Sequence, residues 1–338
     1  MAKKQLYFSI IIPVRKSTKY LNKCLKSIKN QDYPNKLIEV IIVSLEPLKI
    51  KKIDSIPIKI IHDTNANCAE ARNIASKNAK GDILAFIDDD CIAPPNWLSK
   101  AEKYFKNSDV VVVGGSSIPP HKAPLLQKCT GIIVSSFFGT ASMRSRYKQL
   151  KSQPRKCDET ELILANMFVR KKVFKKIKGF DIKQVPCEEN ELNNRIKKAG
   201  YTLLYVPDLV VEHRMRPLFL PFFKRVYFYA IGRGIMSCRF PETLKILYLV
   251  PSIFVLGIFL GIFTSIFNQF MRILFIFMLS LYFLVLLIGG IKECLNKKDI
   301  RLLFIFIIGI FFHHVSYGLG FLRGVYSYLR GTWGAQKI

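Results

Sequence analysis

Up to about residue 215, the chain alternates short apolar runs with amphipathic, lysine-rich segments. The apolar runs are rich in β-branched residues and lack the polar/apolar alternation of a strand with one exposed face. Strands of this kind are typical of a parallel sheet that is covered on both faces. The runs that we interpret as strands are 6–14, 38–44, 58–62, 82–88 and 109–115.

Two segments between these runs have the period of an α-helix. In residues 19–31 apolar side chains recur every three or four positions, which places them on one face. Residues 67–81 repeat this pattern with alanines, and Gly81 is placed to end the helix. Both segments lie where crossover helices of a parallel sheet belong. The sequence therefore predicts an α/β domain over residues 1–215.

The character of the chain changes after about residue 240. Residues 246–267, 273–291 and 302–322 contain no Lys, Arg, Asp or Glu. Each segment is long enough to cross a hydrocarbon core about 30 Å thick. We therefore predict a transmembrane region over residues 244–338 with about three helices, and a multi-pass protein of the cell membrane.

Basic residues predict the orientation of these helices. The loop 292–301 carries several Lys and Arg, whereas Arg272 alone lies near the other loop. The positive-inside tendency then places loop 292–301 and the N-terminal domain on the cytoplasmic side. It also leaves Arg323, Arg330 and Lys337 outside, against the same tendency. Either this tail stays at the interface, or the predicted number of spans is wrong by one.

Residues 216–243, between the two regions, mix Arg and Lys with Phe and Tyr and contain Pro217 and Pro221. This composition is typical of an amphipathic segment that rests on lipid headgroups. The alternative is two ordinary helices that close the soluble domain.

Composition narrows the classes of function. The 338 residues include 52 basic and 24 acidic ones, for a formal net charge of +28, which favours nucleic acid or an anionic membrane face as a partner. The apolar C-terminal third favours the membrane, and no basic patch with interleaved aromatic residues supports nucleic acid. The eight cysteines form no C-x-x-C pair, so we expect a reduced compartment and no cysteine-ligated metal.

Three adjacent carboxylates, Asp88, Asp89 and Asp90, follow the apolar run 82–88 with no Lys or Arg beside them. Such charges repel one another in a partly buried loop unless they take up protons or share a cation. Mg²⁺ commonly binds through one or two carboxylates plus substrate phosphates, so Asp88 and Asp90 are candidate ligands. The alternative is a solvated turn in which Asp90 or Asn96 caps the next helix.

A second acidic group, Glu188, Glu189 and Glu191, opens a helical pattern that ends at Gly200. Acids at a helix N-terminus suit the helix dipole and require no chemistry. Crowded carboxylates, however, can raise one pKa toward the value that a general base needs. The sequence leaves both interpretations open.

Taken in order, four segments resemble the inverting family-2 glycosyltransferases of GT-A fold. The resemblance covers residues 6–215 and predicts a GT-A, Rossmann-like nucleotide-diphospho-sugar transferase domain. The C-terminal part is more loosely similar to membrane-anchored members that build surface polysaccharide or lipid-linked glycans. The segments are SIIIPVRKSTKYLNKCLKSIKNQDYP, EARNIASKNAKGDILAFIDDD, LILANMFVRKKVFKKIKGFD and EENELNNRIKKAGYTLLYVPDLVVEH.

The resemblance implies roles for individual residues. Asp88 and Asp90, with His213 nearby, would hold Mg²⁺ or Mn²⁺ on the donor's diphosphate. Glu189, where the family usually has Asp, or its neighbour Glu188, would deprotonate the acceptor hydroxyl. The implied acceptor contacts are Asn166 and Glu191. Ser44 and Glu46 stand where relatives carry DDGS and are further nucleotide-sugar contacts. The other implied nucleotide-sugar contacts are Pro13, Arg15, Arg72, Asn73, Asp88 and Asp89.

These features together predict an inverting, metal-dependent glycosyltransferase. Its donor would be a nucleotide sugar, and its acceptor a membrane-held polyprenyl phosphate or lipid-linked glycan. One alternative, a processive polysaccharide synthase, would carry a Q-x-x-R-W segment, which the two tryptophans of this chain do not form. The other is a non-catalytic membrane scaffold that retains a sugar-nucleotide-binding fold. The sugar, the nucleotide and the oligomeric state stay open.

Overall fold

The computed structural model describes residues 5–16, 19–48, 50 and 55–334. The chain divides into two compact units. Unit 1 comprises the described residues of Met1–His121 and Ser145–Arg214, together with Gly334. Unit 2 comprises Lys122–Arg144 and Met215–Trp333. Lys337, named above for the C-terminal tail, lies outside the described residues.

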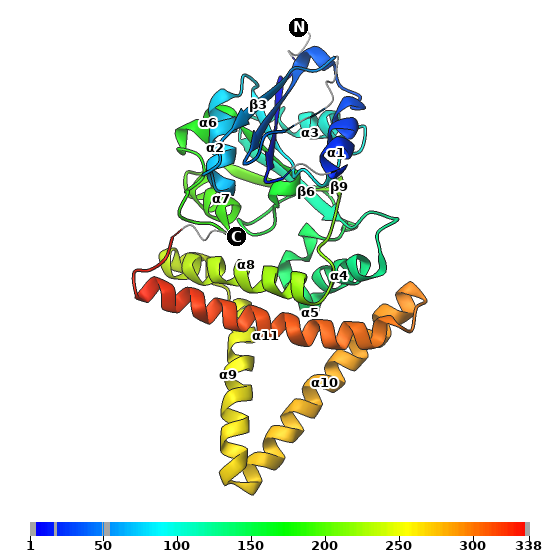
Figure 1. The fold of residues 1–338 in the computed structure, drawn as a ribbon, viewed down its shortest axis with the longest axis vertical. Coiled ribbons are helices and arrows are strands. Elements are labelled where there is room, and N and C mark those ends of the chain that lie inside the picture. Colours follow the sequence, from blue (N-terminus) through cyan, green and yellow to red (C-terminus); the bar gives the residue numbers. More distant parts are fainter. Residues whose placement is uncertain (1–4, 17–18, 49, 51–54, 335–338) are drawn as a thin grey trace. The chain divides into compact units, whose positions relative to one another are not determined.

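A mixed sheet forms the centre of unit 1 (Figure 1). Strands β1, β2, β3 and β4 are mutually parallel, as predicted, and β6 is parallel to β9. The short β8 runs antiparallel to both of its neighbours, and β5 and β7 run antiparallel to β9, so the prediction of a parallel sheet is wrong at these three strands. The order is β3 (Ile58–His62), β2 (Ile38–Ser44), β1 (Phe8–Val14), β4 (Ile83–Phe86), β8 (Met167–Arg170), β6 (Val110–Ile118), β9 (Thr202–His213) and β5 (Cys91–Ile92), and β7 (Arg155–Lys156) pairs with β9.

Helices cover both faces of this sheet. Ile10 and Ile12 of β1 pack with helices α1 (Lys19–Lys29) and α3 (Trp97–Tyr104). The intervening Ile11 packs on the other face with α2 (Cys68–Asn78), α6 (Lys171–Lys176) and α7 (Glu188–Lys198). Burial on both sides explains the unbroken apolar runs of the central strands. The edge strand β3 is half-exposed, so the prediction that every strand is covered on both faces is wrong for β3.

Gly81 has a different role from the one predicted. Helix α2 ends at Asn78, and Gly81 lies beyond the end of the helix. A Cβ atom at Gly81 would lie 2.6 Å from the backbone nitrogen of Ser9 in β1. Glycine is therefore required by the close approach of two backbones rather than by a helix terminus.

Unit 2 contains the apolar helices. Three of them, α9, α10 and α11, are long and apolar enough to cross a membrane, and α9 has the predicted bounds. Helix α8 is a single helix, because Pro221 lies in its first turn, where a missing N–H costs nothing. The helices are α4 (Leu125–Ser135), α5 (Phe137–Thr140), α8 (Leu220–Arg239), α9 (Ile246–Phe267), α10 (Gln269–Lys297) and α11 (Leu302–Leu329).

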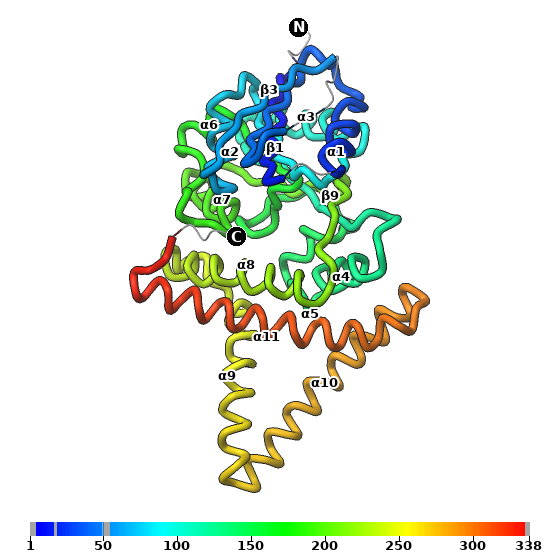
Figure 2. Tube along the Cα trace, in the orientation of Figure 1, coloured from blue at the N-terminus to red at the C-terminus, as the bar shows by residue number. Residues whose placement is uncertain are grey.

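Glycines bring α8 and α11 into close contact. A Cβ atom at Gly324 would lie 2.2 Å from the Ile231 carbonyl oxygen, and one at Gly320 would lie 2.3 Å from that of Tyr227. Residue numbers rise together along the two helices, so α8 and α11 are parallel neighbours (Figure 2). Small residues at a helix interface allow such close approach.

Residues 122–144 lie within the predicted first domain but belong to unit 2. Their helix α4 packs against α11, where Ile133 approaches Gly309. His313 donates from Nε2 to the carbonyl oxygen of Gly139 at 2.7 Å, and His314 donates to that of Phe138 at 2.8 Å. The Phe137 carbonyl oxygen accepts from the amide of Ala141 at the end of α5, and the last carbonyl groups of a helix have no partner within it. These hydrogen bonds give the two histidines of an apolar helix a structural role within unit 2.

Candidate active site

The carboxyl ends of the parallel strands β1, β2 and β4 meet at one edge of the sheet, the edge at which α/β folds bind ligands. Four predicted nucleotide contacts lie along this edge. Pro13 is half-buried at the end of β1 and Arg15 is exposed beyond it. Ser44 is buried at the end of β2 and donates from Oγ to the carbonyl oxygen of the exposed Glu46.

The three aspartates after β4 are half-buried at the same edge. His213 Nε2 lies 3.2 Å from Asp90 Oδ1, because the pairing of β5 with β9 brings Cys91 opposite His213. Burial, with the charges of Asp90 and Asp88, raises the pKa of Asp89 to about 7. Burial acts in the same direction on Asp90, but His213 and Arg214 hold the pKa of that carboxyl below its ordinary value.

Donor atoms of Asp90, Cys91 and His213 lie within 4.8 Å of one another. Burial raises the pKa of the Cys91 thiol well above its ordinary value, and Mg²⁺ and Mn²⁺ prefer carboxylate oxygens to thiolates. A carboxylate and an imidazole do fit a divalent cation such as Mn²⁺. The structure thus brings together two of the three predicted metal ligands, Asp90 and His213.

The third predicted ligand, Asp88, meets an arginine instead. Arg72 Nη2 lies 3.0 Å from Asp88 Oδ1, and Arg72 Nη1 lies 3.0 Å from Glu188 Oε1. Burial opposes the charge on this guanidinium, but Asp88 and Glu188 raise the pKa of Arg72, so the group stays charged. Arg72 therefore links the aspartate cluster to the N-terminus of α7, which follows a hundred residues later.

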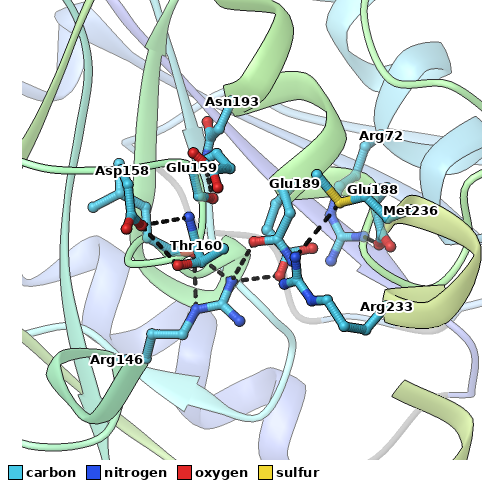
Figure 3. A network of polar contacts seen from close by, with 12 residues as sticks. Arg72, Arg146, Asp158, Glu159, Thr160, Glu188, Glu189, Asn193, Arg233 and Met236 are labelled. Carbon is cyan, nitrogen blue, oxygen red and sulfur yellow. Dashed lines mark hydrogen bonds and ion pairs between the residues drawn. The ribbon is translucent and has the colours of Figure 1, made fainter. Parts of the chain in front are cut away.

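The predicted base, Glu189, also pairs with an arginine. Arg146 Nη2 lies 2.5 Å from Glu189 Oε1, and Arg146 Nε donates to the Leu162 carbonyl oxygen at 3.0 Å (Figure 3). A guanidinium held in this way fixes the direction of the carboxylate. Both side chains are buried, Arg146 with 1% of its surface exposed.

Sequence reasoning missed Arg146. It is one of 52 basic residues, lies at the end of a short 3₁₀-helix, Ala141–Arg146, and stands 43 residues before Glu189. No periodicity or motif marks it, so the chain offers no signal that could have found it.

The side chains of both predicted acceptor contacts are buried and engaged by protein groups. Asn166 is fully buried; its Oδ1 accepts from Trp97 Nε1 at 2.8 Å, and its Nδ2 donates to the carbonyl oxygens of Ser116 and Leu209. Glu191 is buried and pairs with Arg195, one turn later, at 2.6 Å. Both side chains are engaged by protein groups and hold the core together.

Asn73 is similarly engaged. Its Nδ2 donates to the Phe180 carbonyl oxygen, and its Oδ1 accepts from the Phe180 amide, each at 2.9 Å. This reciprocal pair holds α2 against the segment after Gly179, whose positive φ of 69° favours a glycine. The predicted nucleotide contact by the Asn73 side chain is therefore not supported.

Comparisons with known proteins find glycosyltransferases. The family described as Glycosyl transferase family 2 matches residues 9–178. Glycosyltransferase AglE of Haloferax volcanii is 26% identical over 220 residues, which cover 62% of this chain and 68% of that protein. A Methanococcus voltae enzyme, dolichyl N-acetyl-alpha-D-glucosaminyl phosphate 3-beta-D-2,3-diacetamido-2,3-dideoxy-beta-D-glucuronosyltransferase, is 23% identical over 335 residues, 94% of this chain and 98% of that protein.

A solved structure shows the same fold. It is mannosyltransferase PcManGT from Pyrobaculum calidifontis, in complex with GDP-Man and Mn²⁺. The TM-score is 0.55 at 16% identity, and the match covers 72% of this chain and 66% of that one, slightly under two thirds of its length. This likeness confirms the predicted GT-A fold of the N-terminal region.

Proposed function

Because the chain belongs to glycosyl transferase family 2, we propose that it moves a sugar, with inversion, from a nucleotide sugar to a membrane-held acceptor in a reaction that needs a divalent cation. The acceptor class is a polyprenyl phosphate or a lipid-linked glycan. The protein works at the cell membrane, with its glycosyltransferase domain on the cytoplasmic side.

The observation that carries this proposal is the buried set of ion pairs around Arg72 and Arg146. Carboxylates from two distant segments meet arginines in the interior, at the ligand-binding edge of the sheet. Buried ion pairs are weak contributors to stability, because desolvation offsets their attraction. Their concentration at this edge therefore supports a catalytic rather than a purely structural role.

Separate residues of the chain deprotonate the acceptor and orient the base. Glu189 accepts the proton of the acceptor hydroxyl as its oxygen attacks the anomeric carbon, and Arg146 orients the carboxylate. Glu188 shares Arg72 with Asp88, so we assign the base role to Glu189. A single displacement inverts the configuration of the sugar.

Asp90 and His213 would hold the cation, Mg²⁺ or Mn²⁺, with Asp88 beside them. When bound, such a cation neutralises the negative charge that grows on the departing diphosphate. Arg15 and Asp89 lie at the same edge of the sheet and supply nucleotide contacts.

Two relatives support the substrate classes. The Methanococcus voltae enzyme is named for a dolichyl-phosphate-linked sugar, and its match extends through the apolar helices of this chain. The Pyrobaculum calidifontis enzyme was solved with a nucleotide sugar and Mn²⁺. These relatives favour a lipid-linked acceptor, a nucleotide-sugar donor and a divalent cation here.

A donor screen tests the proposal. Purified full-length protein in detergent is mixed with a panel of sugar nucleotides and a short polyprenyl phosphate, and nucleoside diphosphate release is followed. We expect one preferred donor, loss of release with chelator, recovery with Mn²⁺ or Mg²⁺, and a lipid product with inverted anomeric configuration by NMR. Glu189→Gln is the catalytic control. Release that persists in chelator, or a product of retained configuration, would contradict the mechanism.

A further inference from the structure

The three long apolar helices of unit 2 do not form an antiparallel bundle. Near its start α11 contacts the end of α10, where Leu303 approaches Gly290. Fifteen residues later, at Gly318, it contacts the start of α9 at the Pro251 carbonyl oxygen. Between these two points Phe311 still stacks on Phe283 of α10, and His314 lies within hydrogen-bond distance of Tyr282, so α11 leaves α10 near the middle of both helices. The change of neighbour shows that α11 runs across the open end of the α9–α10 hairpin (Figures 1 and 2).

Helix α11 is also fastened to α8 along most of its second half. Gly320 and Gly324 approach the backbone of Tyr227 and Ile231, and Gly234 approaches that of Phe321. Two parallel helices in backbone contact must share one direction relative to a membrane. The direction of α8 therefore decides the direction of α11.

Helix α8 is a poor membrane span. It carries basic residues in each part of its length, and among the described helices it is not one of those long and apolar enough to cross. Charged side chains at bilayer depth are costly, whereas basic residues at the headgroup level are favourable. The four basic residues of α8 are Lys224, Arg225, Arg233 and Arg239.

The hairpin, in contrast, has the properties of an inserted element. Helix α9 has 22 residues, which at 1.5 Å per residue is about 33 Å, enough for a hydrocarbon core of about 30 Å. Large apolar side chains toward its tip are exposed, with Phe259 at 63% and Phe277 at 62%. Nothing within the described chain covers them.

The distribution of charge agrees with this contrast between an inserted α9–α10 hairpin and a helix α8 that does not cross. Arg272 is the one charged residue near the hairpin tip. Lys245 and the loop 292–301 flank its open end, Arg323 lies in the second half of α11, and Arg330 directly follows that helix. If α11 does not cross, all of these basic residues except Arg272 stay on one side, as the positive-inside tendency requires.

We propose that the α9–α10 hairpin alone crosses the bilayer, and that α8 and α11 lie in the plane of its interface. The chain then crosses twice, and its C-terminus returns to the side on which it enters α8. With three spans, Arg323 and Arg330 would lie outside, against the positive-inside tendency. With two spans, they lie on the same side as loop 292–301. The partner of the exposed hairpin is the hydrocarbon of a lipid bilayer.

Protease accessibility in sealed membrane vesicles tests this topology. Full-length variants carry one inserted cleavage site in the exposed loop before Ser152, between Asn268 and Gln269 at the hairpin tip, or after Gly334. The Ser152 site marks the side of the N-terminal unit. We expect the site after Gly334 to be cut whenever the Ser152 site is cut, and the tip site to be protected until detergent opens the vesicles.

Two results would overturn the proposal. Protection of the site after Gly334 together with the tip would show that α11 crosses, and cutting of the tip together with Ser152 would show that the hairpin does not. Thermal unfolding in detergent checks each variant. Should the tip insertion unfold the protein, Gln269→Cys with an impermeant maleimide replaces it, and labelling of the peptide around residue 269 is read by mass spectrometry. No readout depends on transferase activity, so the test stands apart from the proposed function.

Discussion

Burial shows that the acidic residues at the start of α7 are partners in ion pairs rather than exposed charges at a helix terminus. In the sequence, Glu188, Glu189 and Glu191 are compatible with an exposed helix N-terminus, but in the structure all three are buried and each pairs with an arginine. The carboxylates were recognisable from the sequence because they cluster. The partners of Glu188 and Glu189 were not, since Arg72 and Arg146 reach these carboxylates through the fold, whereas Arg195 lies one turn after Glu191 on the same helix.

Arg146 should be essential for turnover if it orients the base. We expect Arg146→Met to lower kcat by roughly 100-fold, as for other misplaced catalytic groups, with a much smaller change in donor affinity. Loss of a buried ion-pair partner should also destabilise the fold by about 3–5 kcal/mol. Kinetics well below the melting temperature separate the two effects. The matched control, Arg195→Met, removes the partner of Glu191 on the same helix, and equal losses of kcat in both variants would argue against orientation by Arg146.

Asp90 should carry metal-dependent donor binding. Asp90→Asn keeps the size of the side chain but removes its charge, so we expect donor affinity in Mn²⁺ to fall by roughly 10- to 100-fold, the range for perturbed metal sites. Calorimetric titration with and without Mn²⁺ measures this loss. Asp208→Asn, at an exposed carboxylate paired with Lys100, is the control and should bind like the wild type. Unchanged affinity in the Asp90 variant would remove it from the metal site.

Asn166 should behave as a core residue rather than as an acceptor contact. Asn166→Leu leaves Trp97 Nε1 and two buried carbonyl oxygens without their hydrogen-bond partner. Each such group costs about 1–3 kcal/mol, so a fall in melting temperature of several degrees is expected. An unchanged melting temperature with a higher KM for the acceptor would instead favour the original prediction.

The elements were mostly predictable, but their ends depend on distant groups. Helix α3 illustrates this: Asn96, a candidate cap by sequence, makes no capping hydrogen bond, and the amide of Leu98 donates instead to Gln31 from the end of α1. Similarly, the end of α5 depends on two histidines in α11. Periodicity predicts where a helix runs, whereas its termini often use side chains that only folding brings near.

The glycines of α11 should tolerate no side chain. In Gly324→Ala the added methyl would collide with the Ile231 carbonyl, and overpacking of this kind costs about 1–3 kcal/mol. Gly257→Ala in α9, where nothing lies within 4 Å of the new atom, is the matched control and should be neutral. Thermal unfolding in detergent compares the two variants. Equal stability would mean that α8 and α11 are not in backbone contact.

On the scale of the whole molecule, the two units are not consecutive in sequence. Residues 122–144 leave unit 1, contribute α4 and α5 to unit 2, and return. A hydropathy profile does not detect this excursion, because α4 is too short to be a span. Its apolar side chains pack against α11, and the sequence gives no sign of this contact.

This arrangement predicts how a fragment will behave. A chain ending at residue 215 keeps α4 but loses α11, so Ile133 and its neighbours become exposed. We expect this fragment to aggregate without detergent in size-exclusion chromatography. The same fragment with Ile133→Ser and Val134→Ser should elute closer to a monomer. A monodisperse unmodified fragment would show that α4 does not need α11.

The sequence by itself determined the α/β domain, the GT-A resemblance, the apolar helices and the acidic clusters, because these are encoded in local pattern and in the order of motifs. Only the tertiary structure decided which carboxylate meets which arginine, that Asn166, Glu191 and Asn73 are held by protein groups, and that 122–144 packs with α11. Except for the local pair of Glu191 and Arg195, these contacts join residues from 16 to more than a hundred positions apart, and no local periodicity records them. The path of α11 across its hairpin is likewise a property of packing, since its composition alone is that of a membrane span.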